Sequence, residues 1–338
     1  MMLVKVIREL GEYNNIVVTL VPDNHFGDEL TCDKYYCLNL STLIFVPKAA
    51  LQLKKIILEN NVDMVHTHLF WPTVIARMGT PKNIPLVTTI HAFIATSIEY
   101  RNFHIRLIDK LTYRLRKNII IAVAKGAQEE YFNFLKLKPH QNYSLYTFVD
   151  TNEFNSEKVE SSCREKKVFK LITVGALREQ KNHKFLVEAL SLMKDEEIEL
   201  DVYGTGPLRE DIKRQISGKG SRVNLKGEVR NIPHLIKNYD LFVMSSTYEG
   251  FSLGVLEAMA MKVPLLLSDI KSFREQCEGT ACYFDLEKIT DFVSKLKQLI
   301  ADKTQRGLMA EQAKARVLQN FTLDQHMQGL RKIYLQAM

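Results

Sequence analysis

The sequence alternates short apolar runs with segments of helical periodicity, and it does so in two series. The apolar runs of the first series are at residues 16–21, 63–66, 85–90 and 119–123. Those of the second series are at residues 169–174, 199–203, 241–244 and 264–267. Strands that alternate with helices form parallel sheets covered by those helices. The pattern therefore predicts an α/β protein with two such sheets.

Between the two series, residues 154–167 are polar, charged and without periodicity. Such a break in composition marks a linker between domains. A chain of 338 residues has room for two domains of about 150 to 170 residues, each with its own core. We predict a first domain at residues 1–155, a linker at 156–167 and a second domain at 168–321.

Composition excludes several classes of protein. No apolar run approaches the roughly 18 residues of a membrane span, and the N-terminal residues lack a signal-peptide core. The five cysteines form no Cys-x-x-Cys pair, which argues against a disulfide framework and structural zinc. The net charge of +7 comes without a recognised nucleic-acid motif. We expect a cytoplasmic protein without a metal, a cofactor or a nucleic-acid partner.

The chain begins with a helical pattern, because Leu3, Val6, Ile7 and Leu10 follow the i, i+3, i+4, i+7 spacing. The alternative is a strand at residues 3–7. Only a short polar segment would then join it to the strand at 16–21, and parallel strands need a longer crossover. The sequence therefore favours a helix at the start.

A turn with a carboxylate follows the apolar strand at residues 241–244. Glu249 lies in this turn, at the carboxyl end of the strand, where open α/β sheets bind their ligands. The backbone N–H groups of Phe251, Ser252 and Leu253 are expected to be unpaired there, so that an anion would fit. A carboxylate at this position is also an ordinary helix cap, and Glu249 alone leaves both readings open.

Glu257 lies beyond this turn and inside the following helical segment, among apolar helix formers at residues 255–260. A carboxylate near a core needs hydrogen-bond partners, which ribose or sugar hydroxyls would supply. A second motif, which is basic, follows the strand at 169–174. Gly175 ends that strand, and Arg178 and Lys181 come next. Two such cations suit a diphosphate without a metal. Taken alone, they also fit a solvated basic loop.

The segment 246–260 resembles the Glu-x7-Glu signature of retaining, nucleotide-sugar-dependent glycosyltransferases with the GT-B fold. That family commonly has Gly where Ser252 stands and often Pro where Gly254 stands, but both glutamates are present. The resemblance implies two Rossmann-like domains that face a central cleft. It also implies that a C-terminal helix at residues 322–338 crosses back to the first domain.

The resemblance assigns roles to both motifs. Loop 174–183 resembles the family's diphosphate-binding loop, so Arg178 and Lys181 are expected to stabilise the departing diphosphate with the amides after Gly250. Glu249 is expected to hold sugar hydroxyls, and Glu257 the ribose hydroxyls. The complete predicted donor-binding set is Gly175, Gly204, Gly206, Val229, Gly250, Phe251, Ser252, Leu253 and Glu257.

Gly204 and Gly206 resemble the family's glycine-rich turn near the nucleotide, although a simple tight turn explains them equally well. Residues 227–230, with Val229, resemble the loop that holds the base. In the first domain, His91 ends a strand and resembles the histidine that hydrogen-bonds the donor sugar. His68 matches a position near the acceptor. A structural histidine is the alternative in both cases.

Family members begin with a strand and a Gly-rich loop before the first helix, and this chain opens inside that helix. The resemblance thus implies that the first strand and its loop are missing, which leaves the chain's catalytic competence open. A start codon placed too far downstream would explain the pattern.

Residues 101–117 carry many cations and only one acid, Asp109, along a helical pattern. Ile105, Ile108, Leu111 and Leu115 supply an apolar stripe. Such a helix is expected to contact anionic lipid at the inner face of the membrane, and an ordinary surface helix is the alternative.

The resulting hypothesis is a metal-independent hexosyltransferase. It moves a sugar from a nucleotide-diphosphate donor to a glycan or lipid-linked acceptor and retains the anomeric configuration. The catalytic set is His91, Arg178, Lys181 and Glu249. Two alternatives remain: a catalytically impaired GT-B protein that serves as a binding or partner subunit, and a sugar-nucleotide epimerase of similar architecture.

Overall fold

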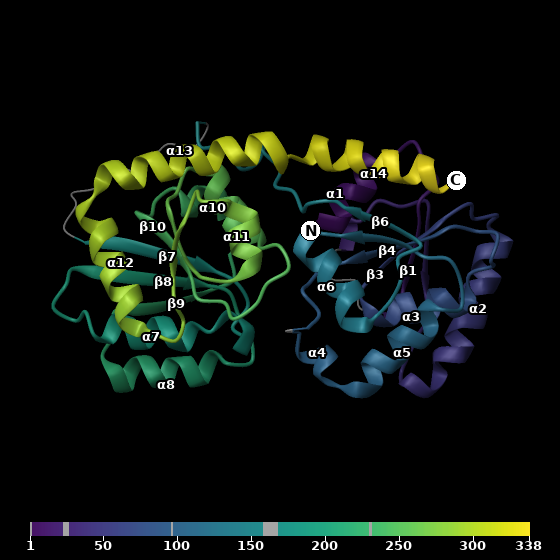
Figure 1. The fold of residues 1–338 in the computed structure, drawn as a ribbon, viewed down its shortest axis with the longest axis horizontal. Helices are drawn as coiled ribbons and strands as arrows, with labels where there is room; N and C mark the ends of the chain where they lie inside the picture. The colour runs from purple at the N-terminus through teal and green to yellow at the C-terminus, as the bar shows by residue number, and fades with distance from the viewer. Residues whose placement is uncertain (1, 23–26, 96, 158–167, 230–231) are drawn as a thin grey trace. The chain divides into compact units, whose positions relative to one another are not determined.

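A computed structural model describes residues 2–22, 27–95, 97–157, 168–229 and 232–338. The chain divides into two compact units (Figure 1). Unit 1 contains residues 1–145 and 327–338, and unit 2 contains residues 146–326. Most of the linker predicted at 156–167 lies outside the described residues.

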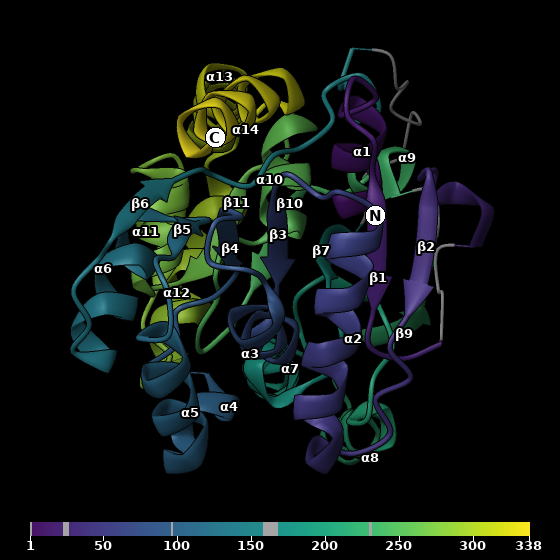
Figure 2. The same cartoon turned by 90° about the vertical axis from the view of Figure 1, so that its right-hand side faces the viewer.

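Among its described residues, unit 1 has six parallel strands in two separate sheets, where the apolar runs predicted a single sheet for each domain. Its strands are β1 (Ile16–Thr19), β2 (Lys34–Cys37), β3 (Val65–His68), β4 (Leu86–Ile90), β5 (Ile119–Ala122) and β6 (Gln141–Ser144). The larger sheet has the order β3-β4-β5-β6, while β1 pairs only with β2 among the described strands. Figure 2 shows β1 and β2 side by side, apart from β3 to β6.

The helices of unit 1 pack against these sheets. They are α1 (Met2–Glu9), α2 (Val46–Glu59), α3 (Phe70–Gly79), α4 (Ile98–Arg101), α5 (Phe103–Tyr113) and α6 (Lys125–Leu135), with short 3-10 turns at Gly27–Glu29 and Leu43–Phe45. Helix α3 packs between α2 and α5 (Figure 2). The predicted N-terminal helix is confirmed as α1, and no strand precedes β1 in the described chain.

Unit 2 is built on one parallel sheet with the order β12-β11-β10-β7-β8-β9. The strands are β7 (Phe169–Val174), β8 (Ile198–Tyr203), β9 (Val223–Gly227), β10 (Leu241–Met244), β11 (Leu265–Ser268) and β12 (Cys282–Phe284). The interior strands β10 and β11 are buried along their whole length, which explains their continuous apolar sequence.

The helices of unit 2 surround this sheet. They are α7 (His183–Ser191), α8 (Arg209–Lys219), α9 (Ile232–Ile236), α10 (Leu253–Ala260), α11 (Lys271–Cys277), α12 (Ile289–Ala301), α13 (Lys303–Asn320) and the start of α14 (Leu323–Ala337), with a 3-10 turn at Glu179–Lys181. Helix α7 packs against α8 and α12, and α10 packs against α13 (Figure 1). Helix α10 also contacts α9.

The end of the chain belongs to unit 1. On α14, Tyr334 lies 2.6 Å from the Nδ1 atom of His66, and Arg331 donates to Glu12 at 2.6 Å. The unit boundary falls before Tyr146, because residues 146–149 pack within unit 2. There the ring of Tyr146 meets that of Phe321, and the amide of Val149 donates to the Phe321 carbonyl at 2.9 Å.

The predicted helix at residues 101–117 needs correction. Helix α5 ends at Tyr113, and Ile105 and Ile108 pack inward against the core clusters of unit 1. Arg116 is buried and donates to the backbone carbonyls of Thr80 and Ile84. The predicted stripe is therefore partly core, and one of the predicted surface cations is a structural residue.

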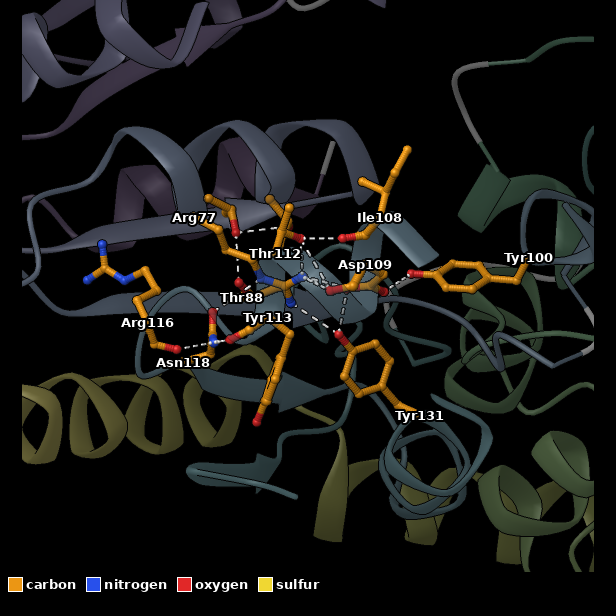
Figure 3. Close-up of polar contacts among 12 residues, drawn as sticks. Arg77, Thr88, Tyr100, Ile108, Asp109, Thr112, Tyr113, Arg116, Asn118 and Tyr131 are labelled. Carbon is orange, nitrogen blue, oxygen red and sulfur yellow. Dashed lines mark hydrogen bonds and ion pairs between the residues drawn. The ribbon is translucent and has the colours of Figure 1, made fainter. Parts of the chain in front are cut away.

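A buried ion pair joins the helices of unit 1 (Figure 3). Arg77 on α3 contacts Asp109 on α5 at 2.5 Å, and both side chains are at most 3% exposed. Tyr100 on α4 donates to Asp109 Oδ2 at 2.5 Å, and Tyr131 on α6 donates to Oδ1 at 3.0 Å. One carboxylate thus links four helices, and the guanidinium of Arg77 balances its charge.

Replacing Asp109 alone is expected to destabilise unit 1 strongly, because Arg77 would remain charged, buried and unpaired. We expect Asp109→Ala to lower the free energy of unfolding by about 3 to 5 kcal/mol. The double variant Arg77→Met, Asp109→Leu removes both charges and is expected to lose less. The chain's single tryptophan, Trp71 on α3, allows urea unfolding of unit 1 to be followed by fluorescence. A double variant as unstable as Asp109→Ala would contradict this account.

Candidate active site

Three neighbouring strands of unit 2 carry the predicted donor site at their carboxyl ends. The sheet order places β7 between β10 and β8, and all three run in parallel. The loop after β7 holds Lys181, the turn after β10 holds Glu249, and the loop after β8 holds Gly204. Residues far apart in sequence therefore meet at one edge of the sheet.

Lys181 and Glu249 form a close ion pair at this edge. The ammonium Nζ lies 2.6 Å from Glu249 Oε1, and the two side chains are 17% and 7% exposed. Ser246 donates to the same oxygen at 2.6 Å, and Gln180 donates to Oε2 at 3.3 Å. The carboxylate is thus the acceptor of three hydrogen bonds and is held in one orientation.

Gly175 leaves room for the side chain of Lys181. A Cβ atom at Gly175 would stand 3.1 Å from Lys181 Cε, so the lysine stem passes directly over this residue. Arg178 behaves differently. It is exposed, and its side chain makes no hydrogen bond or ion pair within the described part of the chain. The two predicted cations thus have separate positions, one paired and one open to solvent.

Gly204 and Gly206 let two loops approach closely. A Cβ atom at Gly204, whose φ is +141°, would stand 2.1 Å from the carbonyl oxygen of Gly175. At Gly206 it would stand 2.6 Å from the carbonyl oxygen of Leu177. The amide of Leu177 donates to the Thr205 carbonyl at 2.9 Å. Close backbone packing is sufficient to explain both glycines.

The start of α10 differs from expectation. The amide of Ser252 donates to Gln276 Oε1 at 3.0 Å, and Gln276 Nε2 donates back to the Ser252 carbonyl at 2.8 Å. The prediction that this amide is unpaired is therefore wrong. No partner for the amide of Leu253 is found among the described residues, as expected for the first turn of a helix.

The remaining predicted donor residues occupy the same part of unit 2. Gly250 and Phe251 are buried in the turn before α10, and Glu257 is half-buried on that helix. Val229 is half-buried and follows β9. These positions leave their predicted roles in donor binding as predictions.

In unit 1, His91 directly follows β4 and meets a second histidine. The Nδ1 atom of His68 lies 2.9 Å from His91 Nε2, so one ring nitrogen donates and the other accepts. The register of β3 and β4 sets His68 opposite Thr89 and brings the rings together. Leu69, the residue after His68, has a φ of 70°. A non-glycine residue in this conformation is strained, and such strain is concentrated at functional sites.

A pocket of about 100 Å³ opens beside His91. Its lining includes His91, Thr89, Leu69, Phe70 and Tyr100. Arg77, Asp109 and Tyr131 of the buried network also line it. The site in unit 1 therefore combines aromatic walls with the only histidine of the predicted catalytic set.

His68, which was expected near the acceptor, contacts His91. Two residues that hold Glu249, Ser246 and Gln180, were not predicted. Their only sequence signal is proximity to a predicted residue or to a strand end. Among the described residues, no group of three or more His, Cys, Asp or Glu side chains is placed to hold a metal ion.

Two families match the sequence, one in each half. Residues 3–153 match the family described as "Glycosyltransferase Family 4", and residues 168–302 match "Glycosyl transferases group 1". The two domains of this chain are those of a GT-B glycosyltransferase. No helix in the described part of this glycosyltransferase is long and apolar enough to cross a membrane.

Similar proteins are known from several bacteria. The UDP-Gal:alpha-D-GlcNAc-diphosphoundecaprenol alpha-1,3-galactosyltransferase of Escherichia coli is 24% identical over 326 residues, which cover 88% of this chain and 81% of that protein. The N-acetylgalactosamine-N,N'-diacetylbacillosaminyl-diphospho-undecaprenol 4-alpha-N-acetylgalactosaminyltransferase of Campylobacter jejuni is 24% identical over 281 residues, covering 80% and 76%. Anabaena HepE, solved in complex with UDP and glucose, shares the fold with a TM-score of 0.83 and 16% identity, covering 100% and 95%.

His183 gives this glycosyltransferase a pH-dependent stability. It begins α7, is 3% exposed, and its Nδ1 atom has no hydrogen-bond partner among the described residues. Burial, with a smaller contribution from the charge of Lys181, lowers the pKa of His183 to about 4. The folded state therefore holds this imidazole neutral at pH 7.

The unfolded chain binds a proton at His183 below a pKa of about 6.5, whereas the folded chain resists it down to about 4. Stability from this residue is thus complete above pH 6.5 and decreases as the pH falls toward 4, by about 3 kcal/mol in total. We expect His183→Gln to flatten the dependence of unfolding free energy on pH in calorimetry. His104→Gln, at an exposed histidine, is the control and is expected to leave the slope unchanged.

Proposed function

We propose that this protein transfers a hexose from a nucleoside diphosphate sugar to a lipid-linked glycan, with retention of anomeric configuration. The observation that carries the proposal is the nearly buried Lys181–Glu249 pair at the carboxyl ends of β7 and β10. The E. coli and C. jejuni relatives, whose names specify diphosphoundecaprenol-linked substrates, support the acceptor class. The UDP in Anabaena HepE supports the donor class.

The donor's charges match the separate positions of the two cations. Arg178, exposed at the start of its 3-10 turn, can grip phosphate oxygens in two places, while Lys181 supplies a point charge beside Glu249. With the first-turn amides of α10, they would stabilise the charge that develops on the leaving diphosphate. No metal is required for this neutralisation.

Glu249 would hold hydroxyls of the donor sugar, since its three donors fix its orientation. Glu257 would hold the ribose. His91, a residue of unit 1, would contact the donor sugar. The acceptor hydroxyl attacks the anomeric carbon as the bond to the diphosphate breaks, and its proton passes to a leaving phosphate oxygen. Attack and departure on the same face would retain the configuration without a covalent nucleophile.

The decisive assay supplies UDP- and GDP-sugars with diphosphoundecaprenol-linked N-acetylglucosamine and follows nucleotide release and glycolipid formation. NMR of the new linkage decides between retention and inversion. Nucleotide binding without transfer to any acceptor would instead favour the impaired, partner-subunit alternative. Inversion would refute the proposed stereochemistry alone.

The diphosphate assignment predicts the effect of removing both cations. We expect the double variant Arg178→Ala, Lys181→Ala to weaken UDP binding at least about tenfold, because charge-assisted hydrogen bonds to phosphate are lost. Lys184→Ala is the matched control, since Lys184 lies in the same region but pairs with Glu179 at 3.8 Å. Isothermal titration with UDP measures both, and equal affinities in the two variants would count against the assignment.

We further propose that unit 1 contacts the anionic lipid surface where such acceptors reside. The proposed contact is a docking face with apolar residues Ile98, Phe103, Leu107, Leu111 and Leu115, which are 55%, 61%, 39%, 52% and 51% exposed. Arg101, Arg114 and Lys117 are exposed on the same segment. Asp109 does not offset these cations, because Arg77 neutralises it in the interior.

The docking face predicts binding to vesicles of phosphatidylcholine with phosphatidylglycerol, weakened by salt. We expect Phe103→Gln, Leu111→Gln to reduce co-sedimentation with these vesicles several-fold. Leu318→Gln, at a leucine of α13 that is 48% exposed, is the control and is expected to bind as the parent does. Binding that is equal in all three proteins, or independent of the anionic lipid, would contradict the contact.

A further inference from the structure

Helix α4 is too short to hold its own position. It contains four residues, Ile98–Arg101, and a single turn is unstable by itself because its nucleation cost is not recovered. Three of its side chains, Ile98, Glu99 and Arg101, are exposed. Tyr100 is 7% exposed and is the one residue of α4 that reaches the interior.

Tyr100 belongs to an apolar core cluster of unit 1 and makes both a ring contact and a hydrogen bond there. Its ring meets Phe70 edge to face, with centroids 5.9 Å apart, and its hydroxyl donates to Asp109 Oδ2 at 2.5 Å. The other donors to this carboxylate, Arg77 and Tyr131, contact Oδ1. Tyr100 is thus the donor found for Oδ2 among the described residues.

Asp109 is a rigid anchor for this bond. The same Arg77 that pairs with it also donates to Asn118 at 3.2 Å and to Tyr131 at 3.1 Å. These contacts come from Tyr131 on α6 and from Asn118, the residue before β5, so the guanidinium that holds the carboxylate is itself held on several sides. A hydrogen bond to this carboxylate therefore fixes α4 relative to the body of unit 1.

Helix α4 lies close to His91 in the sequence and borders the same pocket. Ser97, Glu99 and Tyr100 line that pocket together with His91. The intervening chain has a second anchor, since the amide of Ala95 donates to Glu130 on α6 at 2.8 Å. This part of the pocket lining is thus held by two hydrogen bonds to buried or half-buried carboxylates.

We propose that Tyr100 is a positioning residue: its hydrogen bond to Asp109 latches α4 in place as the wall of the pocket that contains His91. The effect on sugar transfer rests on the proposed function, whereas the latch itself does not. The buried ion pair then has a purpose beyond stability, which a pair of this kind seldom increases relative to apolar residues.

The test compares Tyr100→Phe with Tyr113→Phe. Both variants lose one buried hydroxyl, but Tyr113 donates to the Lys138 carbonyl at 3.1 Å, away from the pocket lining. Its ring still belongs to the network, since the guanidinium of Arg77 lies 5.3 Å from its centroid. The fluorescence of Trp71 establishes that both variants are folded at the assay temperature.

Hydrogen exchange by mass spectrometry reads the latch directly. We expect amide exchange in peptides covering residues 97–102 to accelerate about tenfold to hundredfold in Tyr100→Phe, and to stay at the parent rate in Tyr113→Phe. Unchanged exchange in Tyr100→Phe would overturn the latch, whatever the activity. Equal acceleration in both variants would show general loosening of unit 1 and would also overturn it.

Transfer kinetics read the positioning role. We expect Tyr100→Phe to lower kcat about tenfold or more while the affinity for UDP, which unit 2 provides, stays at the parent value. Faster exchange with kcat equal to that of Tyr113→Phe would refute the positioning role. Failure of the parent protein to transfer any sugar would refute the proposed function, and the exchange measurement would still decide whether the latch exists.

Discussion

Parallel pairing of the strands is the constraint on which the site depends. Every strand pair in both units is parallel, so the loops at the carboxyl ends of neighbouring strands gather at one edge. In unit 2 this brings Lys181, after β7, to Glu249, after β10. In unit 1 the same rule, with the register of β3 and β4, brings His68 to His91. Glycines are needed where the crowded loops touch, as at Gly204.

Each unit also holds a buried or nearly buried ion pair, and the two pairs differ in what surrounds them. Arg77 and Asp109 lie in the interior and connect helices, and each neutralises the charge of the other without a ligand. Lys181 and Glu249 lie at the end of the sheet, beside the exposed Arg178 and the first turn of α10. The second arrangement has donors and charge to offer a ligand, whereas the first offers rigidity.

Among the described strands, the sequence predicted all those inside a sheet and, of the edge strands, β1 and β3. Strands β5, β10 and β11 are fully buried, and their continuous apolar runs were sufficient to identify them. The strands that the apolar runs did not mark are β2, β6, β9 and β12, and each lies at the edge of its sheet. An edge strand is partly solvated, so its sequence is more polar and lacks that signal. For the site, motifs identified Lys181 and Glu249 separately, but nothing local predicted Ser246 or Gln180 as their partners.

The sequence by itself determined the parallel strands of two α/β domains, the helix at the start and the chemical types gathered at the strand ends, because hydrophobic periodicity and turn residues act over a few positions. Only the tertiary structure decided which groups pair. The sequence showed Asp109 as a lone acid on a basic helix, yet it is the buried partner of Arg77. It placed Ile105 and Ile108 in an apolar stripe on the surface, yet they pack against the core. Such pairings depend on strand order, register and the rotation of a helix about its axis. These are fixed by contacts between residues distant in sequence, which no local pattern records.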